Sequence, residues 1–313
     1  MSDTVRIAIT GATCMTGIAL TKLALDEGHE VIAIVRPGSA GTADLPVSKK
    51  LKTAECNISD YDRIKDADKC DMFFHLAWDK TAGAGRDDVY TQLNNIEYTL
   101  DAVRLAKSWG ASAFVGAGSQ AEYGLMDRKA CNDTPTNPTS GYGIAKYAAG
   151  KMAAILCGQL GVKFCWSRIF SSYGEHDREY TLIMYLIRTM LAGNIPELTK
   201  CGQTWDYIYT GDVARALLAI GLRGIDGRTY QIGTGECRPL KGYVTDIRDA
   251  IDPNIELKFG VKEYYPHQQM FLCADIGDLT KDTGFVPACS FKEGIARTVS
   301  FVRDQMSRRS RSD

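Results

Sequence analysis

The sequence has little net charge and no long apolar run. Its 37 Lys and Arg residues balance 38 Asp and Glu residues, leaving a formal net charge of −1. No global field therefore favours nucleic acid or an anionic membrane as a partner. No apolar run reaches the roughly 18–20 residues of a membrane span. The N-terminus enters a strand at once, so we expect no signal peptide and no membrane partner.

Cysteine pairs with a recognisable spacing are also missing. The ten cysteines are scattered, without a C-x-x-C pair or a His/Cys cluster at zinc-ligand spacing. We therefore expect no metal site, reduced thiols and a cytoplasmic location.

What the chain does have is a regular alternation of apolar strands and helices. The second strand, Val31–Val35, is β-branched and apolar on both faces, which is typical of a buried parallel strand. We expect strands near 5–9, 31–35, 51–56, 72–76, 113–116 and 163–166, with helices near 18–27, 61–67, 87–109 and 142–160. This alternation predicts an α/β fold with a doubly wound parallel sheet.

A glycine-containing turn, Thr10–Gly17, joins the first strand to the first helix. Glycine lets a backbone approach a pyrophosphate, and a helix N-terminus offers free N–H groups and a favourable dipole. The first strand-to-helix turn of an alternating chain is where Rossmann-like folds bind a dinucleotide. The alternative is an ordinary turn.

The end of the second strand indicates which dinucleotide binds. Enzymes that use NAD usually place a carboxylate there for the ribose hydroxyls. Here Arg36 follows Val35, with Ser39 nearby, and an arginine can pair with a 2′-phosphate. The sequence favours NADP(H) over NAD(H), with a solvated arginine as the alternative.

After Arg168 the alternation gives way to shorter elements. Helices are expected near 182–192 and 212–221, with short strands near 205–209 and 228–232. The segments 246–251, 253 onward and 291–306 are typical of a smaller α/β lobe. We predict a dinucleotide-binding domain at 1–167 to which 206–234 return, and a smaller α/β substrate-binding lobe at 168–205 and 235–313. Neither repeats nor a low-complexity linker separate them, so we expect the two parts to be closely joined.

Tyr142 and Lys146 stand four residues apart at the start of an expected helix. Positions i and i+4 share one helix face, so both side chains can serve one site. A nearby positive charge favours the phenolate of a tyrosine. The pair is therefore a candidate for proton transfer, and the alternative is a chance pair on a helix surface.

Taken in order, these motifs resemble the extended short-chain dehydrogenase/reductase family of nucleotide-sugar epimerases, dehydratases and reductases. The resemblance covers almost the whole chain. Thr10–Gly17 is similar to the family's TGxxGxxG loop, but Cys14 replaces the middle glycine, which should narrow the freedom of the turn. Further similar segments are Asn57-Ile58, His75-Leu76-Ala77, Asn95, Ser119 with Glu122-Tyr123-Gly124, and the stretches 168–174, 205–209 and 230–233.

The resemblance implies roles for these residues. Tyr142 would exchange a proton with a sugar oxygen while the nicotinamide exchanges a hydride with C4. Lys146 would bind the nicotinamide ribose and lower the phenol's pKa, and Ser119 would hydrogen-bond the same oxygen. Asn95 would hold the local backbone or a water. The plainer alternatives are a turn residue for Ser119, a helix-surface residue for Asn95 and a core histidine for His75.

The implied contacts extend along the whole cofactor and the sugar. Cofactor contacts are expected from Gly11, Thr13, Cys14, Met15, Gly17, Arg36, Asn57, Ile58, Leu76, Ala77, Asn95, Tyr142, Lys146 and Phe170. Substrate contacts are expected from Trp78, Lys80, Gln120, Ser171, Trp205 and Arg238.

Two positions beside Ser119 discriminate between reactions. Family dehydratases carry an Asp-Glu pair there, because eliminating water needs its own acid and base. Here Gln120 and Ala121 occupy these positions. Enzymes that epimerise C3 and C5 have a cysteine in place of Gln120. Neither activity is expected.

The expected diphosphate contacts also differ from the family pattern. Trp205 replaces a frequent arginine, and Ser171 replaces an asparagine common in epimerases. Arg238 and Lys241 are candidate substitutes for the missing charge. Trp205 is more similar to the reductases of CDP- or dTDP-linked 4-keto-6-deoxy sugars, such as the abequose-forming type.

The sequence therefore predicts NADPH-dependent reduction of a nucleotide-activated 4-keto-(6-deoxy)sugar, with Tyr142 as proton donor. One alternative is a nucleotide-sugar 4-epimerase with tightly bound NAD, and another is a regulator that senses NAD(P). The helices at 87–109 and 142–160 resemble the pair that forms the family's dimer interface, so a homodimer is expected.

Overall fold

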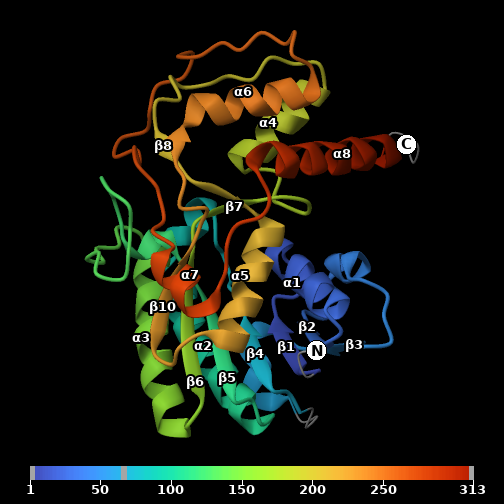
Figure 1. Ribbon diagram of the computed structural model, residues 1–313, viewed down its shortest axis with the longest axis vertical. Coiled ribbons are helices and arrows are strands. Elements are labelled where there is room, and N and C mark those ends of the chain that lie inside the picture. The colour runs from blue at the N-terminus through green and yellow to red at the C-terminus, as the bar shows by residue number, and fades with distance from the viewer. Residues whose placement is uncertain (1–3, 65–68, 310–313) are drawn as a thin grey trace.

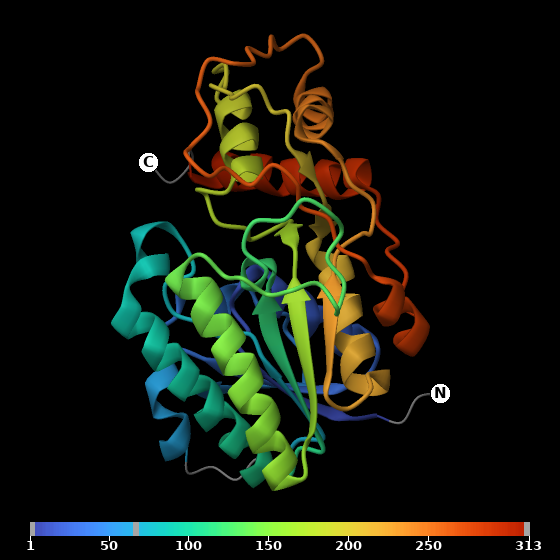
Figure 2. The same ribbon diagram turned by 90° about the vertical axis from the view of Figure 1, so that its left-hand side faces the viewer.

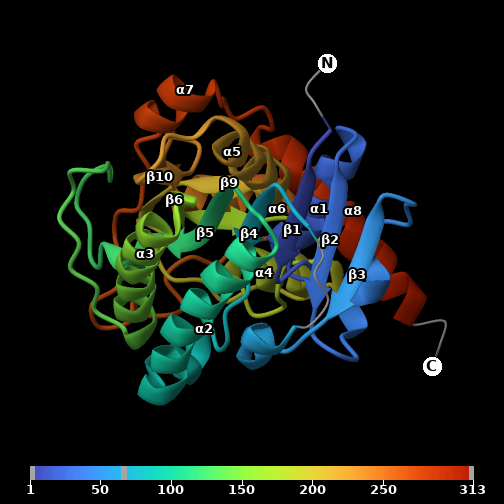
Figure 3. The ribbon, with the colours of Figure 1, turned by 90° about the horizontal axis from the view of Figure 1, so that it is seen from below.

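Seven parallel strands form the central sheet of the computed structural model, which describes residues 4–64 and 69–309. Their order across the sheet is β10-β6-β5-β4-β1-β2-β3, and Figure 3 shows the strands in this sequence. The chain moves outward from β1 in one direction and from β4 in the other, so it reverses between these two strands. The predicted doubly wound α/β fold is confirmed. The strands are β1 (Arg6–Thr10), β2 (Glu30–Val35), β3 (Leu51–Glu55), β4 (Met72–His75), β5 (Ala113–Ser119), β6 (Lys163–Ile169) and β10 (Arg228–Ile232).

Helices cover both faces of this sheet. Along β1, Ile7 and Ile9 share an apolar core with α1 (Met15–Asp26) and α5 (Thr210–Arg223). The intervening Ala8 belongs to a second core with two other helices, because alternate side chains of a strand point to opposite faces. These helices, α2 (Val89–Ser108) and α3 (Gly141–Leu160), lie side by side in Figure 2. The short α7 (Gly277–Thr283) packs beside α5.

A smaller group of elements lies beyond one end of the sheet, at the top of Figure 1. It contains α4 (Leu182–Leu191), α6 (Leu240–Ile251) and α8 (Phe291–Arg309), whose side chains share a separate apolar core. Two small sheets adjoin it, β11-β8 and β7-β9. Their strands are β7 (Ser171–Tyr173), β8 (Thr204–Trp205), β9 (Tyr207–Tyr209) and β11 (Arg238–Pro239). The boundaries of the two functional domains stay a prediction.

The prediction of a helix at 61–67 is wrong in the type and the bounds of the element. A 3-10 helix, η2 (Ile58–Arg63), begins earlier, and residues 65–68 lie outside the described residues. Three further 3-10 helices are η1 (Ala40–Asp44), η3 (Gly83–Asp87) and η4 (Gln120–Glu122). Within the described ranges, we find no helix that combines the length and the apolar character needed to cross a membrane.

Candidate active site

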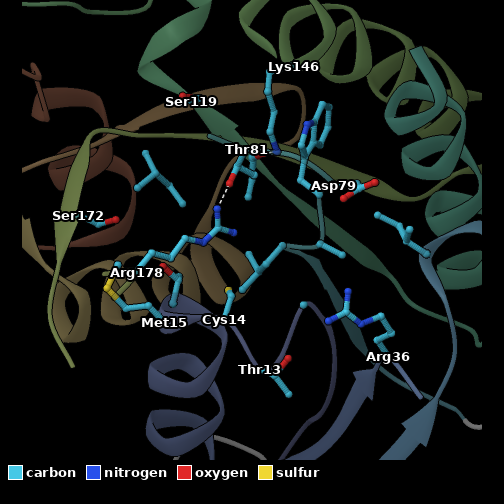
Figure 4. Close-up of a pocket in the computed structure, with 18 of the residues that line it drawn as sticks. Thr13, Cys14, Met15, Arg36, Asp79, Thr81, Ser119, Lys146, Ser172 and Arg178 are labelled. Carbon is cyan, nitrogen blue, oxygen red and sulfur yellow. Dashed lines mark hydrogen bonds between the residues drawn. The ribbon is translucent and has the colours of Figure 1, made fainter. Parts of the chain in front are cut away.

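A cavity of about 910 Å³ opens along the carboxyl ends of the sheet strands. Its wall is built from the segments that follow β1 through β6, and Figure 4 shows its residues. In open α/β sheets, ligands bind at this edge, next to the point where the strand order reverses. The fold therefore gathers residues from both halves of the sheet around one space.

The turn after β1 is packed too closely for side chains at two positions. Gly11 has φ +67°, and a Cβ there would lie 2.7 Å from the backbone nitrogen of Ala77. A Cβ on Gly17 would lie 2.3 Å from the carbonyl oxygen of Gly11. Both positions need glycine, because the loop is pressed against the end of β4 and α1 is pressed against the loop.

Cys14 does not restrict this turn in the way that we expected. Its φ of −81° and ψ of 163° are extended values that any residue adopts, so the position needs no glycine. The thiol caps α1 by accepting a hydrogen bond from the Gly17 N–H at 3.3 Å. Burial raises the pKa of Cys14, and the thiol therefore stays neutral beside the helix N-terminus. This cap also explains why α1 begins at Met15, three residues before the predicted start.

Polar groups gather at the other end of the cavity, after β2. Arg36 is exposed there and shares the cavity wall with Thr13, Ser39 and Asn57. The Ser39 hydroxyl donates to the Thr13 hydroxyl at 3.5 Å. Figure 4 shows the guanidinium of Arg36 beside Thr13 at the edge of the open space. A cation and several hydroxyls thus occupy the region where the adenosine ribose is expected.

Ser119 ends β5 above a buried ion pair. Its backbone N–H donates to Glu122 Oε1 at 2.8 Å, and its hydroxyl accepts from the Ala121 N–H at 3.2 Å. The other oxygen of Glu122 accepts from Arg168 Nε at 2.8 Å, and Trp166 Nε1 donates to Oε1 at 2.9 Å. Both charged side chains are nearly inaccessible. This network fixes the backbone that carries the Ser119 hydroxyl.

Tyr142 lies in the first turn of α3 and lines the cavity together with Ser119. Burial raises the pKa of its phenol, while a hydrogen bond with Ser119 and the positive charge of Arg86 act in the opposite direction. The predicted effect of Lys146 on this pKa stays a prediction.

The Lys146 ammonium is enclosed by neighbouring groups. It donates to the carbonyl of Ala117 at 2.6 Å and lies 3.7 Å from the centre of the Trp78 ring. The distance to the centre of the Tyr142 ring is 5.9 Å. Burial lowers the pKa of Lys146 to about 7, so the side chain is only partly charged near neutral pH.

Buried amides hold the loop between β4 and α2. Asn95 receives a hydrogen bond from the Asp79 N–H at 2.9 Å and donates to the Asp79 carbonyl at 3.0 Å. Gln92 donates to the carbonyls of Lys80 and Gly85, both at 2.9 Å. Asn95 therefore holds the local backbone, as one of its expected roles required, and does not line the cavity.

His75 is a core residue. Its two ring nitrogens lie 2.8 Å from the Thr10 hydroxyl and 3.4 Å from the Thr99 hydroxyl. Burial, with a smaller effect from the charge of Lys146, lowers its pKa to about 3. This environment fits the interpretation of His75 as a histidine of the core.

Most of the predicted site residues share the cavity wall. Those that line it are Gly11, Thr13, Cys14, Met15, Arg36, Asn57, Ile58, Leu76, Ala77, Trp78, Ser119, Gln120, Tyr142, Lys146, Phe170 and Ser171. Those that do not are Gly17, Lys80, Asn95, Trp205 and Arg238.

Two predicted substrate cations are engaged outside the cavity. Lys80 forms an ion pair with Asp88 at 2.6 Å. Arg238 pairs with Asp246, and its guanidinium lies 4.0 Å from the centre of the Tyr243 ring. The structure therefore does not bring these two side chains to the cavity wall, and their contacts with a substrate stay a prediction.

Trp205 is connected to the cavity through another residue. Its indole N–H donates to the Ser171 hydroxyl at 2.8 Å, and Ser171 lines the wall. The tryptophan thus orients a cavity residue rather than facing the space itself.

Sequence reasoning missed a charged segment after β7. His176, Asp177 and Arg178 line the cavity, as does Ser172 within β7. The Arg178 guanidinium donates to the Thr81 hydroxyl from the opposite wall, as Figure 4 shows. The segment follows the motif at 168–174, so its charged residues could be read from the sequence. That their side chains point into the cavity depends on tertiary structure and could not be predicted.

The cavity fits a nicotinamide dinucleotide. The first turn of α1 supplies backbone N–H groups for a pyrophosphate, and the close packing at Gly11 and Gly17 keeps this loop flat against the sheet. Arg36 stands at one end and Tyr142 with Lys146 at the other. Backbone groups of 11–15, Asn57 and Leu76–Ala77 would hold the cofactor between these ends.

Comparison with known proteins agrees with this architecture. The model of the NAD dependent epimerase/dehydratase family matches residues 7–233. The chain is 24% identical over 315 residues to an uncharacterized UDP-glucose epimerase of Bacillus subtilis, covering 95% of this chain and 98% of that protein. It is also 24% identical over 310 residues to CDP-abequose synthase of Salmonella muenchen, covering 94% and 97%.

A solved structure shows the same fold. UDP-glucuronic acid 4-epimerase from Bacillus cereus, in complex with NAD, has a TM-score of 0.82 at 19% identity, covering 96% of this chain and 99% of that one. The family model covers more than half of this chain and includes the glycine loop, Ser119, Tyr142 and Lys146. The chain is therefore an enzyme of the NAD dependent epimerase/dehydratase family, within the extended short-chain dehydrogenases/reductases that its motifs resemble.

Proposed function

We propose that this enzyme reduces a nucleotide-activated 4-keto-(6-deoxy)sugar at the expense of NADPH. The observation that carries the proposal is the composition of one cavity wall. One end of this wall carries the positive charge of Arg36, where the adenosine ribose is expected. The other end carries the hydroxyls of Ser119 and Tyr142, with Gln120 beside them. Cofactor binding and proton transfer can therefore occur in one space.

Arg36 supports NADP(H) as the cofactor. The residue that follows β2 is a cation, and the adjacent Thr13 and Ser39 hydroxyls can donate to a phosphate. A carboxylate, which an NAD site usually has here, would repel a 2′-phosphate. The solved Bacillus cereus neighbour contains NAD, so the choice between the cofactors remains part of the proposal.

Ser119 and Tyr142 would complete the reduction. When bound, the nicotinamide supplies a hydride to the carbonyl carbon of the sugar. Tyr142 donates a proton to the carbonyl oxygen, and Ser119 hydrogen-bonds the same oxygen and aligns it. The raised pKa of Tyr142 keeps the phenol protonated near neutral pH, as a proton donor requires.

The site has no acid and base beside Ser119 that could eliminate water from a sugar. Gln120 lines the cavity, and Ala121 is apolar. The neighbouring carboxylate of Glu122 is buried in its ion pair with Arg168 and accepts from the Ser119 backbone. It therefore cannot serve as the second acid or base that a 4,6-dehydratase needs.

The nucleotide diphosphate would lie toward the smaller lobe. Ser171 and Gln120 offer hydrogen bonds there, and Arg178 offers a positive charge on the same wall. Because Arg238 pairs with Asp246, Arg178 replaces it as the proposed diphosphate contact. In this scheme residues 1–167 and 206–234 bind the cofactor, and residues 168–205 and 235–313 bind the sugar nucleotide.

A nucleotide-sugar 4-epimerase with tightly bound NAD is the second candidate. It is favoured by the names of the Bacillus subtilis relative and the Bacillus cereus neighbour. CDP-abequose synthase instead supports the reductase. A regulator that senses NAD(P) is disfavoured, because the matching family is one of epimerases and dehydratases.

We also propose that the enzyme is a homodimer joined through α2 and α3. Val89, Tyr90 and Leu93 are exposed on α2. Ile144, Met152 and Ile155 are exposed on α3 and recur with the period of one helix face. A cytoplasmic location remains a proposal that rests on ten free thiols.

Tyr142→Phe tests the proposed reaction. The variant keeps the ring but loses the proton, so turnover of CDP- or dTDP-4-keto-6-deoxyglucose should fall about 100-fold or more. Affinity for NADPH, measured by titration calorimetry, should not change. Tyr147→Phe, on the same helix, is the matched control and should keep its turnover. Full activity of Tyr142→Phe would refute this mechanism.

A further inference from the structure

A second cation contacts the ring of Tyr142. The guanidinium carbon of Arg86 lies 4.5 Å from the centre of the phenol ring. Arg86 belongs to η3 and is half-buried, and it is not among the described residues that line the cavity. The guanidinium also donates to the Thr81 carbonyl at 3.4 Å, so it contacts the tyrosine ring and its own loop rather than a ligand in the cavity.

The backbone around Arg86 is anchored to the helix that carries Tyr142. The next residue, Asp87, accepts a hydrogen bond from the Gly141 N–H at 2.8 Å. The preceding Gly85 carbonyl accepts from Gln92 at 2.9 Å. The first contact joins η3 to the first turn of α3 and the second joins it to α2, so the backbone that carries the guanidinium is fixed relative to the ring.

Other charged groups around Tyr142 are farther away or already engaged. Lys146, on the same helix, lies 5.9 Å from the ring and donates to a backbone carbonyl. Arg178, from the segment after β7, donates to a hydroxyl on the opposite wall. Glu122, from η4, is neutralised by its own ion pair and acts on the phenol only as an opposing charge.

We propose that Arg86 is a positioning residue that holds the Tyr142 ring and stabilises its ionised form through direct contact. This inference rests on the proposed role of Tyr142 as the proton donor. When the phenol gives up its proton, the product is a phenolate in a buried place. A guanidinium in contact with the ring lowers the energy of that anion and stays charged at every working pH.

The two cations near Tyr142, Lys146 and Arg86, differ in how fully they are charged near neutral pH. Lys146 has a pKa lowered to about 7 by burial, so its charge is incomplete near neutral pH. Burial raises the pKa of Tyr142, and the charge of Arg86 is among the effects that counteract it. Arg86 therefore adds a permanent positive charge against the phenol ring, beside the partly charged Lys146 on the same helix as Tyr142.

The test measures the ionisation of residue 142 without any substrate. Tyr142 is replaced by 3,5-difluorotyrosine, because fluorine lowers the phenol's pKa into an accessible range and gives a ¹⁹F NMR signal. In this background Arg86→Met and Arg86→Gln should each raise the measured pKa by about one unit. Arg86→Lys, which keeps a cation, should raise it by clearly less. Arg104→Met, on α2 and paired with Asp101, should leave the pKa unchanged.

A second readout separates this inference from the proposed function. With an active sugar nucleotide, Arg86→Met should move the Tyr142 limb of the kcat profile to higher pH while the Kd for NADPH stays constant. An unchanged ¹⁹F pKa in both neutral variants, or an equal shift in Arg104→Met, would overturn the role of Arg86. Absence of turnover in the unmodified enzyme would count against the reductase alone, because the NMR titration needs no substrate.

Discussion

Burial sets the ionisation state of several residues near the cavity. Cys14 stays a neutral thiol at the cap of α1, and Tyr142 stays a neutral phenol beside Ser119. Lys146 loses part of its charge for the same reason. The site therefore holds a neutral phenol, which can donate a proton, beside an amine that is only partly protonated.

His75 makes the stability of the enzyme depend on pH. The folded protein takes up a proton on His75 only near its pKa of about 3, whereas the unfolded chain does so near the ordinary histidine pKa of 6.5. The stabilisation is therefore present above about pH 6.5 and is lost as pH falls toward 3. Each pH unit in this window costs about 1.4 kcal/mol.

Urea unfolding at pH 7 and pH 5 measures this effect. The free energy of unfolding should fall by about 2 kcal/mol more in the wild type than in His75→Gln. His267→Gln, a change at an exposed histidine, should behave like the wild type. Equal pH dependence in all three proteins would contradict the buried neutral state of His75.

At the scale of elements, β5, η4 and β6 are joined by one carboxylate. Glu122 accepts hydrogen bonds from Ser119, Trp166 and Arg168, which stand on or beside these three elements. The ion pair with Arg168 is buried. Because the backbone of Ser119 depends on it, this ion pair supports the active site as well as the core.

Glu122→Gln should therefore be costly. The change leaves the buried guanidinium of Arg168 without a counter-charge, and we expect a loss of about 3–5 kcal/mol in the free energy of unfolding. Glu30→Gln provides the control, because its partner Arg6 lies at the surface and such pairs contribute about 1 kcal/mol or less. A similar cost for both changes, measured by urea unfolding, would show that the Glu122 network is not structural.

The strands and long helices could be predicted because their apolar patterns reflect the core directly. Val31–Val35 is apolar on both faces and is buried in the sheet as β2. The helix predicted at 61–67 fails because short 3-10 turns, unlike long helices, carry no clear apolar period.

The cavity wall was predictable where residues follow strand ends, since parallel strands place their carboxyl ends together. Thr13, Asn57, Ala77 and Ser119 belong to this group. Arg178 and Arg86 were not predictable, because both act by reaching across to another element. The engagement of Arg238 by Asp246 likewise depends on the packing of α6.

At the scale of the whole molecule, α2 and α3 present exposed apolar side chains on one side of the sheet. Leu93 is 58% exposed and Ile155 is 64% exposed, so a second copy of this pair could cover both. We expect Leu93→Glu and Ile155→Glu to convert the proposed homodimer to a monomer in light scattering with size-exclusion chromatography. Val47→Glu, at an exposed position between η1 and β3, should keep the dimer. A monomeric wild type at micromolar concentration would refute this interface.

Residues of both predicted lobes line the cavity described above, so cofactor choice and reaction type can be measured in one experiment. NADPH deuterated at C4 of its ring is incubated with the enzyme and CDP- or dTDP-4-keto-6-deoxyglucose. The product is then analysed by mass spectrometry and NMR. If the enzyme is the proposed reductase, one NADP⁺ forms for each product molecule and deuterium appears at C4 of the sugar. Deuteride transfer from NADPH is then faster than transfer from deuterated NADH. A parallel incubation replaces the keto sugar with UDP-glucose. A C4-epimerised sugar without deuterium and with no net oxidation of the cofactor there, together with no deuterium transfer to the keto sugar, would contradict the account and establish a 4-epimerase.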